Sequence, residues 1–155
     1  MMIYFGLGSN LGDKEKNIAK ALALISERVG KILALSSFYE TEPWGYTSSK
    51  TYLNAVAGVE TNLQPEEVLH ATQEIERIMG RTKKTINRDY HDRVIDIDIL
   101  LYEDLILQTP ELTIPHPLIH QRTFVLQPLS EIAPDAVHPL LGKTMAELYG
   151  SIRKK

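Results

Sequence analysis

The sequence predicts an α+β fold in which two helices alternate with four strands in the order β-α-β-β-α-β, followed by a short helical, Pro-rich C-terminal extension. Two observations support this fold class. Apolar residues recur at helical spacing in two stretches, and strand-like apolar runs bounded by Gly and Pro precede, separate and follow them. With 155 residues and 43% hydrophobic content, the chain can bury a sizeable core, so residues 1–155 are expected to form a single domain.

The first half of the chain is expected to supply three strands and one helix. Residues 2–8 predict a strand, and a turn rich in Gly, Ser and Asn leads to a helix that Asp13 could cap and Gly30 ends. Residues 31–40 and 53–61 predict the second and third strands, joined by a long connection. The apolar stripe of the helix consists of Ile18, Ala21, Leu22, Ile25 and Val29.

The second half is expected to add a helix, a fourth strand and the extension. Pro65 suits a first helical turn, and the helix should run to about Met79. A strand within residues 93–100 completes the order that is typical of ferredoxin-like folds. Beyond Glu103, short helices are expected near residues 117–131 and 144–151. The buried face of the second helix should contain Val68, Leu69, Thr72, Ile75 and Met79.

Composition excludes several classes of protein. No apolar run approaches the roughly 20 residues of a membrane span, and no basic region precedes the short apolar start, so we expect a soluble, cytoplasmic protein. The absence of Cys removes disulfides, thiolate metal sites and Cys nucleophiles. A net charge of -3 argues against a general nucleic-acid binder.

Asp96 and Asp98 are the most informative residues, because Asp is disfavoured in strands. Alternate strand residues share a face, so both carboxylates should point the same way, roughly 6.5 Å apart. A solvated strand face would explain the pair, but Val94 and Leu100 share that face and favour a local polar pocket. The opposite face should carry Ile95, Ile97, Ile99 and Leu101.

The carboxylate pair indicates Mg²⁺ held jointly by the protein and a phosphate-bearing substrate, since hard oxygen ligands suit that ion. Residues 77–93 contain six basic and two acidic residues, a local charge of +4. A basic stretch is usually a solvated loop, but Arg93 lies close enough to the Asp pair to reach the same phosphate.

No standard nucleotide-binding motif is present. The glycines of residues 6–12 have the wrong spacing for a dinucleotide fingerprint, and the chain lacks a P-loop and the protein-kinase motifs. His116 lies between Pro115 and Pro117, six residues before Arg122, and is a candidate for donating a hydrogen bond to a phosphate. Tyr52, Trp44 and Phe124 would ordinarily be core aromatics, whereas Asn54 in a strand could read the edge of a heterocycle.

Eight segments in order resemble the 6-hydroxymethyl-7,8-dihydropterin pyrophosphokinase family of folate biosynthesis. The similarity extends from Tyr4 to about Pro134. It implies a ferredoxin-like fold and transfer of the β,γ-diphosphoryl group of ATP to the pterin hydroxymethyl, with release of AMP. The segments are residues 8–12, 37–41, 52–54, 73–76, 80–81, 93–100, 112–116 and 122–124.

The resemblance also implies roles for individual residues. Asp96 and Asp98 would bind two Mg²⁺ ions and, with Arg81 and Arg93, form the catalytic set. The nucleotide side would involve Gln73, Glu76, Arg81, Lys83, Arg93, His116 and Arg122, with adenine near Ile99 and Thr113. The pterin would contact Thr41, Pro43, Trp44, Tyr52, Asn54 and Phe124.

The chain departs from the family pattern at several positions and leaves two other functions open. The departures are Glu42, Tyr90, His91, Asp92, Glu111 and Pro117. The first alternative is another Mg-dependent phosphoryl-transfer enzyme, such as a kinase or a phosphohydrolase. The second is a non-catalytic ferredoxin-like binding module, which the acidic charge disfavours. The expected partners are ATP and the pterin, with no nucleic acid or membrane, and the protein is expected to be a monomer.

Overall fold

The computed structural model describes residues 1–41, 51–80 and 94–153. Its main sheet has the strand order β2-β4-β1-β5, and the short β3 pairs with β4. All of these pairings are antiparallel. The strands are β1 (Met2–Ser9), β2 (Gly30–Leu35), β3 (Tyr39–Thr41), β4 (Tyr52–Thr61) and β5 (Asp96–Tyr102).

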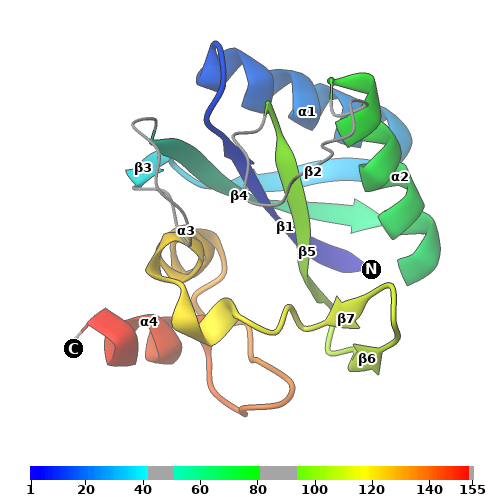
Figure 1. The fold of residues 1–155 in the computed structure, drawn as a ribbon. Coiled ribbons are helices and arrows are strands. Elements are labelled where there is room, and N and C mark those ends of the chain that lie inside the picture. The colour runs from blue at the N-terminus through cyan, green and yellow to red at the C-terminus, as the bar shows by residue number, and fades with distance from the viewer. Residues whose placement is uncertain (42–50, 81–93, 154–155) are drawn as a thin grey trace.

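Helices cover both faces of this sheet (Figure 1). On one face, α1 (Lys14–Arg28) and α2 (Pro65–Ile78) pack over a core that includes Phe5, Ile25 and Ile75. On the other, α3 (Thr123–Ile132) and α4 (Met145–Arg153) pack against a second apolar cluster. Between β5 and α3 lie a hairpin of β6 (Leu107–Gln108) and β7 (Thr113–Ile114) and the 3-10 helix η1 (Ile119–Gln121).

The helix predictions agree with the structure at their starts. Asp13 caps α1, because its carboxylate accepts a hydrogen bond from the Lys16 backbone N–H at 3.2 Å. Pro65 is the first residue of α2, where its missing N–H costs nothing. The helix predicted at residues 117–131 is divided into η1 and α3.

The strand predicted at residues 31–40 is broken in two. β2 ends at Leu35 and β3 begins at Tyr39. Ser36 interrupts the run because its buried hydroxyl accepts the Val56 backbone N–H at 2.9 Å. The prediction of one continuous strand was therefore wrong over residues 36–38.

The predicted alternation fails at two positions, Val94 and Leu101. Val94, which was expected on the face of Asp96 and Asp98, packs against the core on the α1 side. Tyr4 is opposite Leu101 and Phe5 is opposite Ile99, so the register shifts and Leu100 is an extra residue in β5. Leu100 and Leu101 consequently both join the cluster beneath α3 and α4, whereas Ile97 and Ile99 face α1 and α2. The expectation that Leu101 shares the face of Ile99 was wrong.

Among the described residues, no helix combines the length and apolar character that crossing a bilayer requires.

Candidate functional site

A row of polar side chains crosses the sheet face that is turned away from α1 and α2. On β5, Asp96 and Asp98 are half-buried and alternate with buried Ile97 and Ile99. They are opposite Gly8 and Gly6 of β1, and Gly8 is also opposite Asn54 of β4. Adjacent strands lie about 4.8 Å apart, so the Cα atoms of Asp96 and Asn54 are roughly 10 Å apart, with glycine between them.

Gly8 leaves space that the side chains of β4 use. A Cβ added at Gly8 would lie 3.1 Å from Asn54 Oδ1 and 3.4 Å from Tyr52 Cδ1. At Gly6, an added Cβ would meet the Leu100 methyl groups at 3.5 Å, which is ordinary contact. The two glycines therefore form a floor that carries no side chain, bounded by carboxylates on one side and by an amide and a phenol ring on the other.

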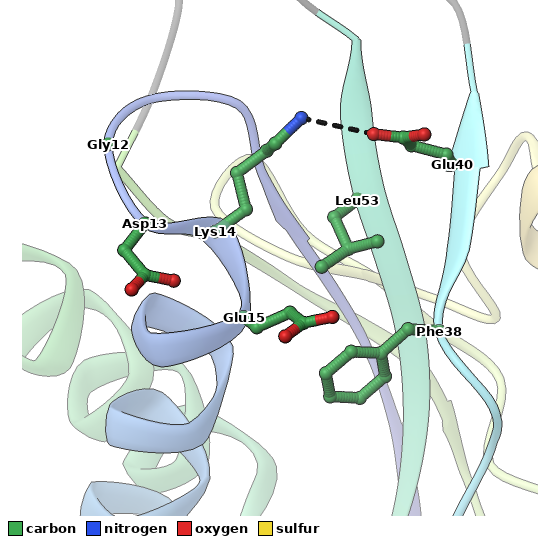
Figure 2. Close-up of a pocket in the computed structure, with 7 residues that line it drawn as sticks. All are labelled: Gly12, Asp13, Lys14, Glu15, Phe38, Glu40 and Leu53. Atoms are coloured by element: carbon green, nitrogen blue, oxygen red, sulfur yellow. Dashed lines mark hydrogen bonds and ion pairs between the residues drawn. The ribbon is translucent and has the colours of Figure 1, made fainter.

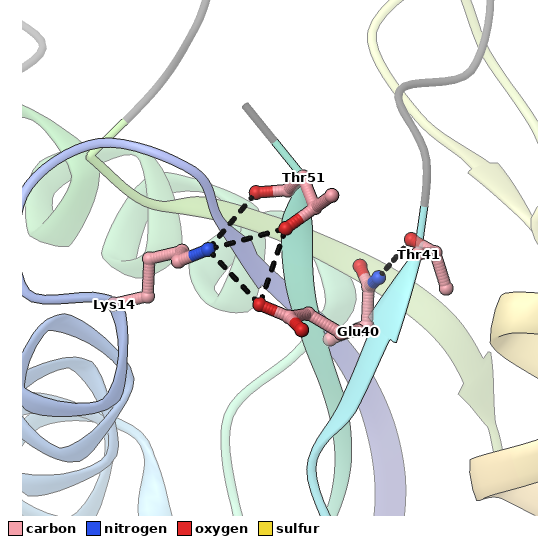
Figure 3. Close-up of polar contacts among 5 residues, drawn as sticks. Lys14, Glu40, Thr41 and Thr51 are labelled. Atoms are coloured by element: carbon pink, nitrogen blue, oxygen red, sulfur yellow. Dashed lines mark hydrogen bonds and ion pairs between the residues drawn. The ribbon is translucent and has the colours of Figure 1, made fainter. Parts of the chain in front are cut away.

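A hydrogen bond fixes the orientation of the Asn54 side chain. Its Nδ2 donates to Thr41 Oγ1 of β3 at 2.7 Å (Figure 3). The amide oxygen, Oδ1, is the atom closest to the vacant Cβ position of Gly8. The sheet thus presents an oriented amide oxygen at the end of the row furthest from the carboxylates.

The segment after β7 brings a histidine and an arginine beside the carboxylates. The His116 backbone N–H donates to Leu100 O at 3.0 Å, which holds this segment against β5. Burial, followed by the nearby Arg122 cation, lowers the pKa of His116 to about 4, although the Asp96 carboxylate acts in the opposite direction. His116 Nδ1 accepts the Leu118 N–H at 3.2 Å, so the neutral ring carries its proton on Nε2.

Arg122 and Phe124 lie together on the same side. The Arg122 guanidinium carbon is 5.5 Å from the centroid of the Phe124 ring, a cation–π contact. Phe124 is half-buried against the second cluster, which leaves part of its ring accessible. The structure thus brings Asp96, His116 and Arg122 together, with Phe124 next to the arginine.

The residues expected on the nucleotide side lie around the outer edge of β5. Glu76 is buried, and its Oε2 accepts the Ile97 backbone N–H at 2.8 Å. Gln73 is exposed one turn earlier on α2. Ile99 is 5% exposed, so only its backbone could meet a ligand, and Thr113 is half-exposed on β7 beside β5.

Five residues that the sequence singled out lie outside the described residues, namely Pro43, Trp44, Arg81, Lys83 and Arg93. The sequence reasoning missed the floor formed by Gly6 and Gly8. Their period-2 spacing matches that of Asp96 and Asp98, and this signal was available. In the sequence alone, the same glycines invite comparison only with a dinucleotide motif.

A hollow of about 480 Å³ lies on the opposite face of the sheet, between the start of α1 and strands β3 and β4 (Figure 2). Leu53 and Phe38, which line it, belong to the core on the α1 side, so the hollow is separate from the carboxylate row. Its lining is completed by Gly12, Asp13, Lys14, Glu15 and Glu40.

The donor set at Asp96 and Asp98 fits Mg²⁺ shared with a substrate. Within residues 1–41, 51–80 and 94–153 there is no group of three or more His, Cys, Asp or Glu side chains that could hold a metal alone. Mg²⁺ is commonly bound by one or two carboxylates, with substrate phosphates and water as its other ligands. Gly8 and Gly6 of β1, which are opposite the two carboxylates, add no side chain that would compete for those ligand positions.

The chain is similar to known pyrophosphokinases over most of its length. The model of the family described as 7,8-dihydro-6-hydroxymethylpterin-pyrophosphokinase matches residues 4–134. The 2-amino-4-hydroxy-6-hydroxymethyldihydropteridine pyrophosphokinase of Porphyromonas gingivalis is 51% identical over 139 residues, which cover 89% of this chain and 94% of that protein. The protein of the same name from Aquifex aeolicus is 38% identical over 145 residues, which cover 94% of this chain and 88% of that protein. The chain is therefore an enzyme of the pyrophosphokinase class.

The chain belongs to the 7,8-dihydro-6-hydroxymethylpterin-pyrophosphokinase family. A crystal structure of Plasmodium falciparum HPPK-DHPS with pteroate superimposes with a TM-score of 0.79 at 18% identity. The alignment covers 97% of this chain and 42% of that chain, so this chain spans less than half of that longer protein. At this identity the likeness supports the fold alone.

Proposed function

We propose that this enzyme transfers the β,γ-diphosphoryl group of ATP to the hydroxymethyl group of 6-hydroxymethyl-7,8-dihydropterin, giving AMP and the pterin diphosphate of folate biosynthesis. The observation that carries the proposal is the row on one sheet face, with carboxylates at one end, bare glycines in the middle and an oriented amide at the other. Such a row offers separate places for a metal-bound polyphosphate and for a flat heterocycle.

Asp96 and Asp98 would hold two Mg²⁺ ions together with the triphosphate. Bound there, the ions would neutralise phosphate charge and polarise the incoming hydroxyl. Arg81, Lys83, Arg93, His116 and Arg122 are the proposed phosphate contacts. Because its pKa is about 4, His116 would act as a neutral Nε2–H donor. Gln73 and Glu76 would shape the nucleotide side, with adenine against the backbone near Ile99 and Thr113.

Tyr52, whose ring lies beside the vacant Cβ position of Gly8, and Phe124, which lies beside Arg122, would sandwich the pterin ring. Asn54 Oδ1 would accept a hydrogen bond from the N–H edge of the ring, since its Nδ2 already donates to Thr41. The backbone near Thr41, Pro43 and Trp44 would complete that edge. These contacts would hold the pterin with its hydroxymethyl group pointing towards Asp96 and Asp98.

The chemistry would then depend on positioning and electrostatics. Asp96 and Asp98 would orient the phosphates, and Arg81 and Arg93 would stabilise charge on the transferring group. No dedicated base is needed, because the hydroxyl proton could leave late, to solvent or to a phosphate oxygen. A sharp dependence of the rate on titration of His116 would contradict this.

The order β2-β4-β1-β5, with α1 and α2 on one face, supports a ferredoxin-like core within a single domain. We propose a monomer that acts in the cytoplasm on small molecules and needs neither a membrane nor a nucleic acid.

The decisive experiment mixes the purified protein with Mg-ATP and 6-hydroxymethyl-7,8-dihydropterin and follows nucleotide products by chromatography. We expect AMP that forms only when the pterin is present. ADP would instead support a monophosphoryl kinase, and free phosphate a hydrolase. Absence of pterin-dependent AMP would overturn the proposed function.

A further inference from the structure

Lys14 is at an electrostatically unfavourable position in α1, and its contacts with other elements account for a lysine there. It is the first residue of the helix, where a cation opposes the helix dipole. Its side chain reaches away from the helix axis and across the hollow to β3, where it forms an ion pair with Glu40 (Figure 2). The lysine therefore joins α1 to a strand that is distant in sequence.

The Lys14 ammonium makes three contacts of equal length. Nζ lies 3.3 Å from Glu40 Oε2, from the Thr51 carbonyl oxygen and from Thr51 Oγ1 (Figure 3). The Thr51 hydroxyl also donates to Glu40 Oε2 at 3.2 Å. These three residues form a closed network, in which the Lys14 side chain is only 26% exposed.

The network lies where β3 needs support. β3 has three residues and pairs with β4 alone among the described strands. Glu40 is its middle residue, and Thr51 directly precedes β4. A hollow lies beside the network, so side chains do not fill this junction, and the Lys14 contacts add to the backbone pairing that holds β3 against β4.

The other end of β3 has a separate anchor. The Glu131 carboxylate of α3 accepts hydrogen bonds from the Ser37 backbone N–H at 3.0 Å and the Tyr39 hydroxyl at 2.8 Å. The start of β3 is thus held from α3 and its middle from α1. Thr41 follows Glu40 as the last residue of β3, and its hydroxyl orients the Asn54 amide.

We infer that Lys14 is a positioning residue for pterin binding: it holds β3 against β4 through Glu40 and Thr51, and so keeps Thr41 within hydrogen-bonding distance of Asn54. This inference rests on the proposed function. Lys14 acts on the opposite face of the sheet from the carboxylate row, so its effect should be confined to the pterin end of the site.

Lys14→Met tests the inference, with Lys20→Met as the matched control, because Lys20 is an exposed lysine on the same helix. Steady-state kinetics should show the KM for the pterin raised by about 3- to 10-fold, the range expected from losing a partly exposed ion pair and its hydrogen bonds. The KM for ATP and kcat should change less than about 2-fold. Lys14→Arg should restore most of the pterin affinity, and Lys20→Met should match the unsubstituted protein.

A double variant distinguishes positioning from general destabilisation. If Lys14 acts through Thr41, then Lys14→Met should add little to the pterin KM of Thr41→Val. Glu40→Gln, at an exposed position, should reproduce part of the Lys14→Met effect even if Lys14→Met folds poorly. The inference would be overturned if the pterin KM were unchanged in both Lys14→Met and Glu40→Gln, or if the effects of Lys14→Met and Thr41→Val were additive. It would also be overturned if Lys14→Met changed kcat and the KM values for the pterin and ATP equally. Normal pterin-dependent AMP formation by the unsubstituted protein would leave the proposed function intact in those cases.

Discussion

Gly8→Ala offers a sharp test of the glycine floor. The added methyl carbon would lie 3.1 Å from Asn54 Oδ1, closer than such contacts normally are, and 3.4 Å from Tyr52 Cδ1, which is at the limit of ordinary contact. Asn54 would have to shift by a few tenths of an ångström. That shift would disturb its 2.7 Å hydrogen bond to Thr41 and the direction of the amide oxygen.

The magnitude follows from the hydrogen bond that the displaced amide oxygen would no longer make to the ligand. A net loss of about 0.5 to 1.5 kcal/mol gives a rise in the pterin KM of roughly 2- to 12-fold. Fold stability should change little, because replacing Gly by Ala in a strand gains about 0.5 to 1 kcal/mol, which offsets the tight contact. The affinity loss should therefore appear without a loss of stability.

The assay combines steady-state kinetics with urea unfolding. Gly150→Ala is the control, since a Cβ added there meets nothing within 4 Å and the residue is in α4, away from the row. A pterin KM within 2-fold of the unsubstituted value in a stable Gly8→Ala protein would refute the idea that Asn54 and Tyr52 lie over Gly8 in the working site.

Four further predictions concern catalysis and stability. Asp98→Ala should abolish most turnover. Arg93→Ala should reduce kcat by about 10³-fold, as loss of a cationic transition-state clamp does. Near-normal turnover of either variant would exclude the proposed role of that residue. Glu76→Ala should lower the free energy of unfolding by about 1 to 3 kcal/mol, because it leaves the Ile97 N–H buried without this acceptor, whereas Glu76→Gln should cost less; equal urea midpoints would contradict this. Burial, and then His120, lower the pKa of His138 in the folded state, so the unfolded chain binds the proton more readily and stability should fall as the pH drops below about 6.5. His138→Gln should flatten that dependence in urea titrations at several pH values, and an unchanged slope would exclude His138 as its source.

The main helices and strands could be predicted because their signals are local. α1 and α2 carry amphipathic stripes with recognisable first turns, and the structure starts each at the expected residue. The β6–β7 hairpin was not foreseen, because strands of two residues have no periodicity to detect. The bulge at Leu100 depends on which residues of β1 pair with β5, and a single strand sequence does not contain that information.

The candidate site could be predicted only in part, for the same reason. Asp96 and Asp98 stood out because carboxylates at period 2 are unusual in an apolar strand. The floor formed by Gly6 and Gly8 has meaning only once β1 is known to lie between β4 and β5. Lys14 contacts Glu40 and Thr51, which are 26 and 37 positions away in the sequence, so no local sequence pattern predicts these contacts.

The bulge in β5 has a consequence for the order in which the molecule is completed during synthesis. By directing both Leu100 and Leu101 towards α3 and α4, it adds apolar surface to a sheet face that only later-translated chain covers. Asp96 and Asp98 can join the sheet early, but His116, Arg122 and Phe124 follow them in the chain. A ribosome-bound chain that ends near Tyr102 would therefore carry the carboxylate pair while still exposing the apolar surface that α3 and α4 later bury.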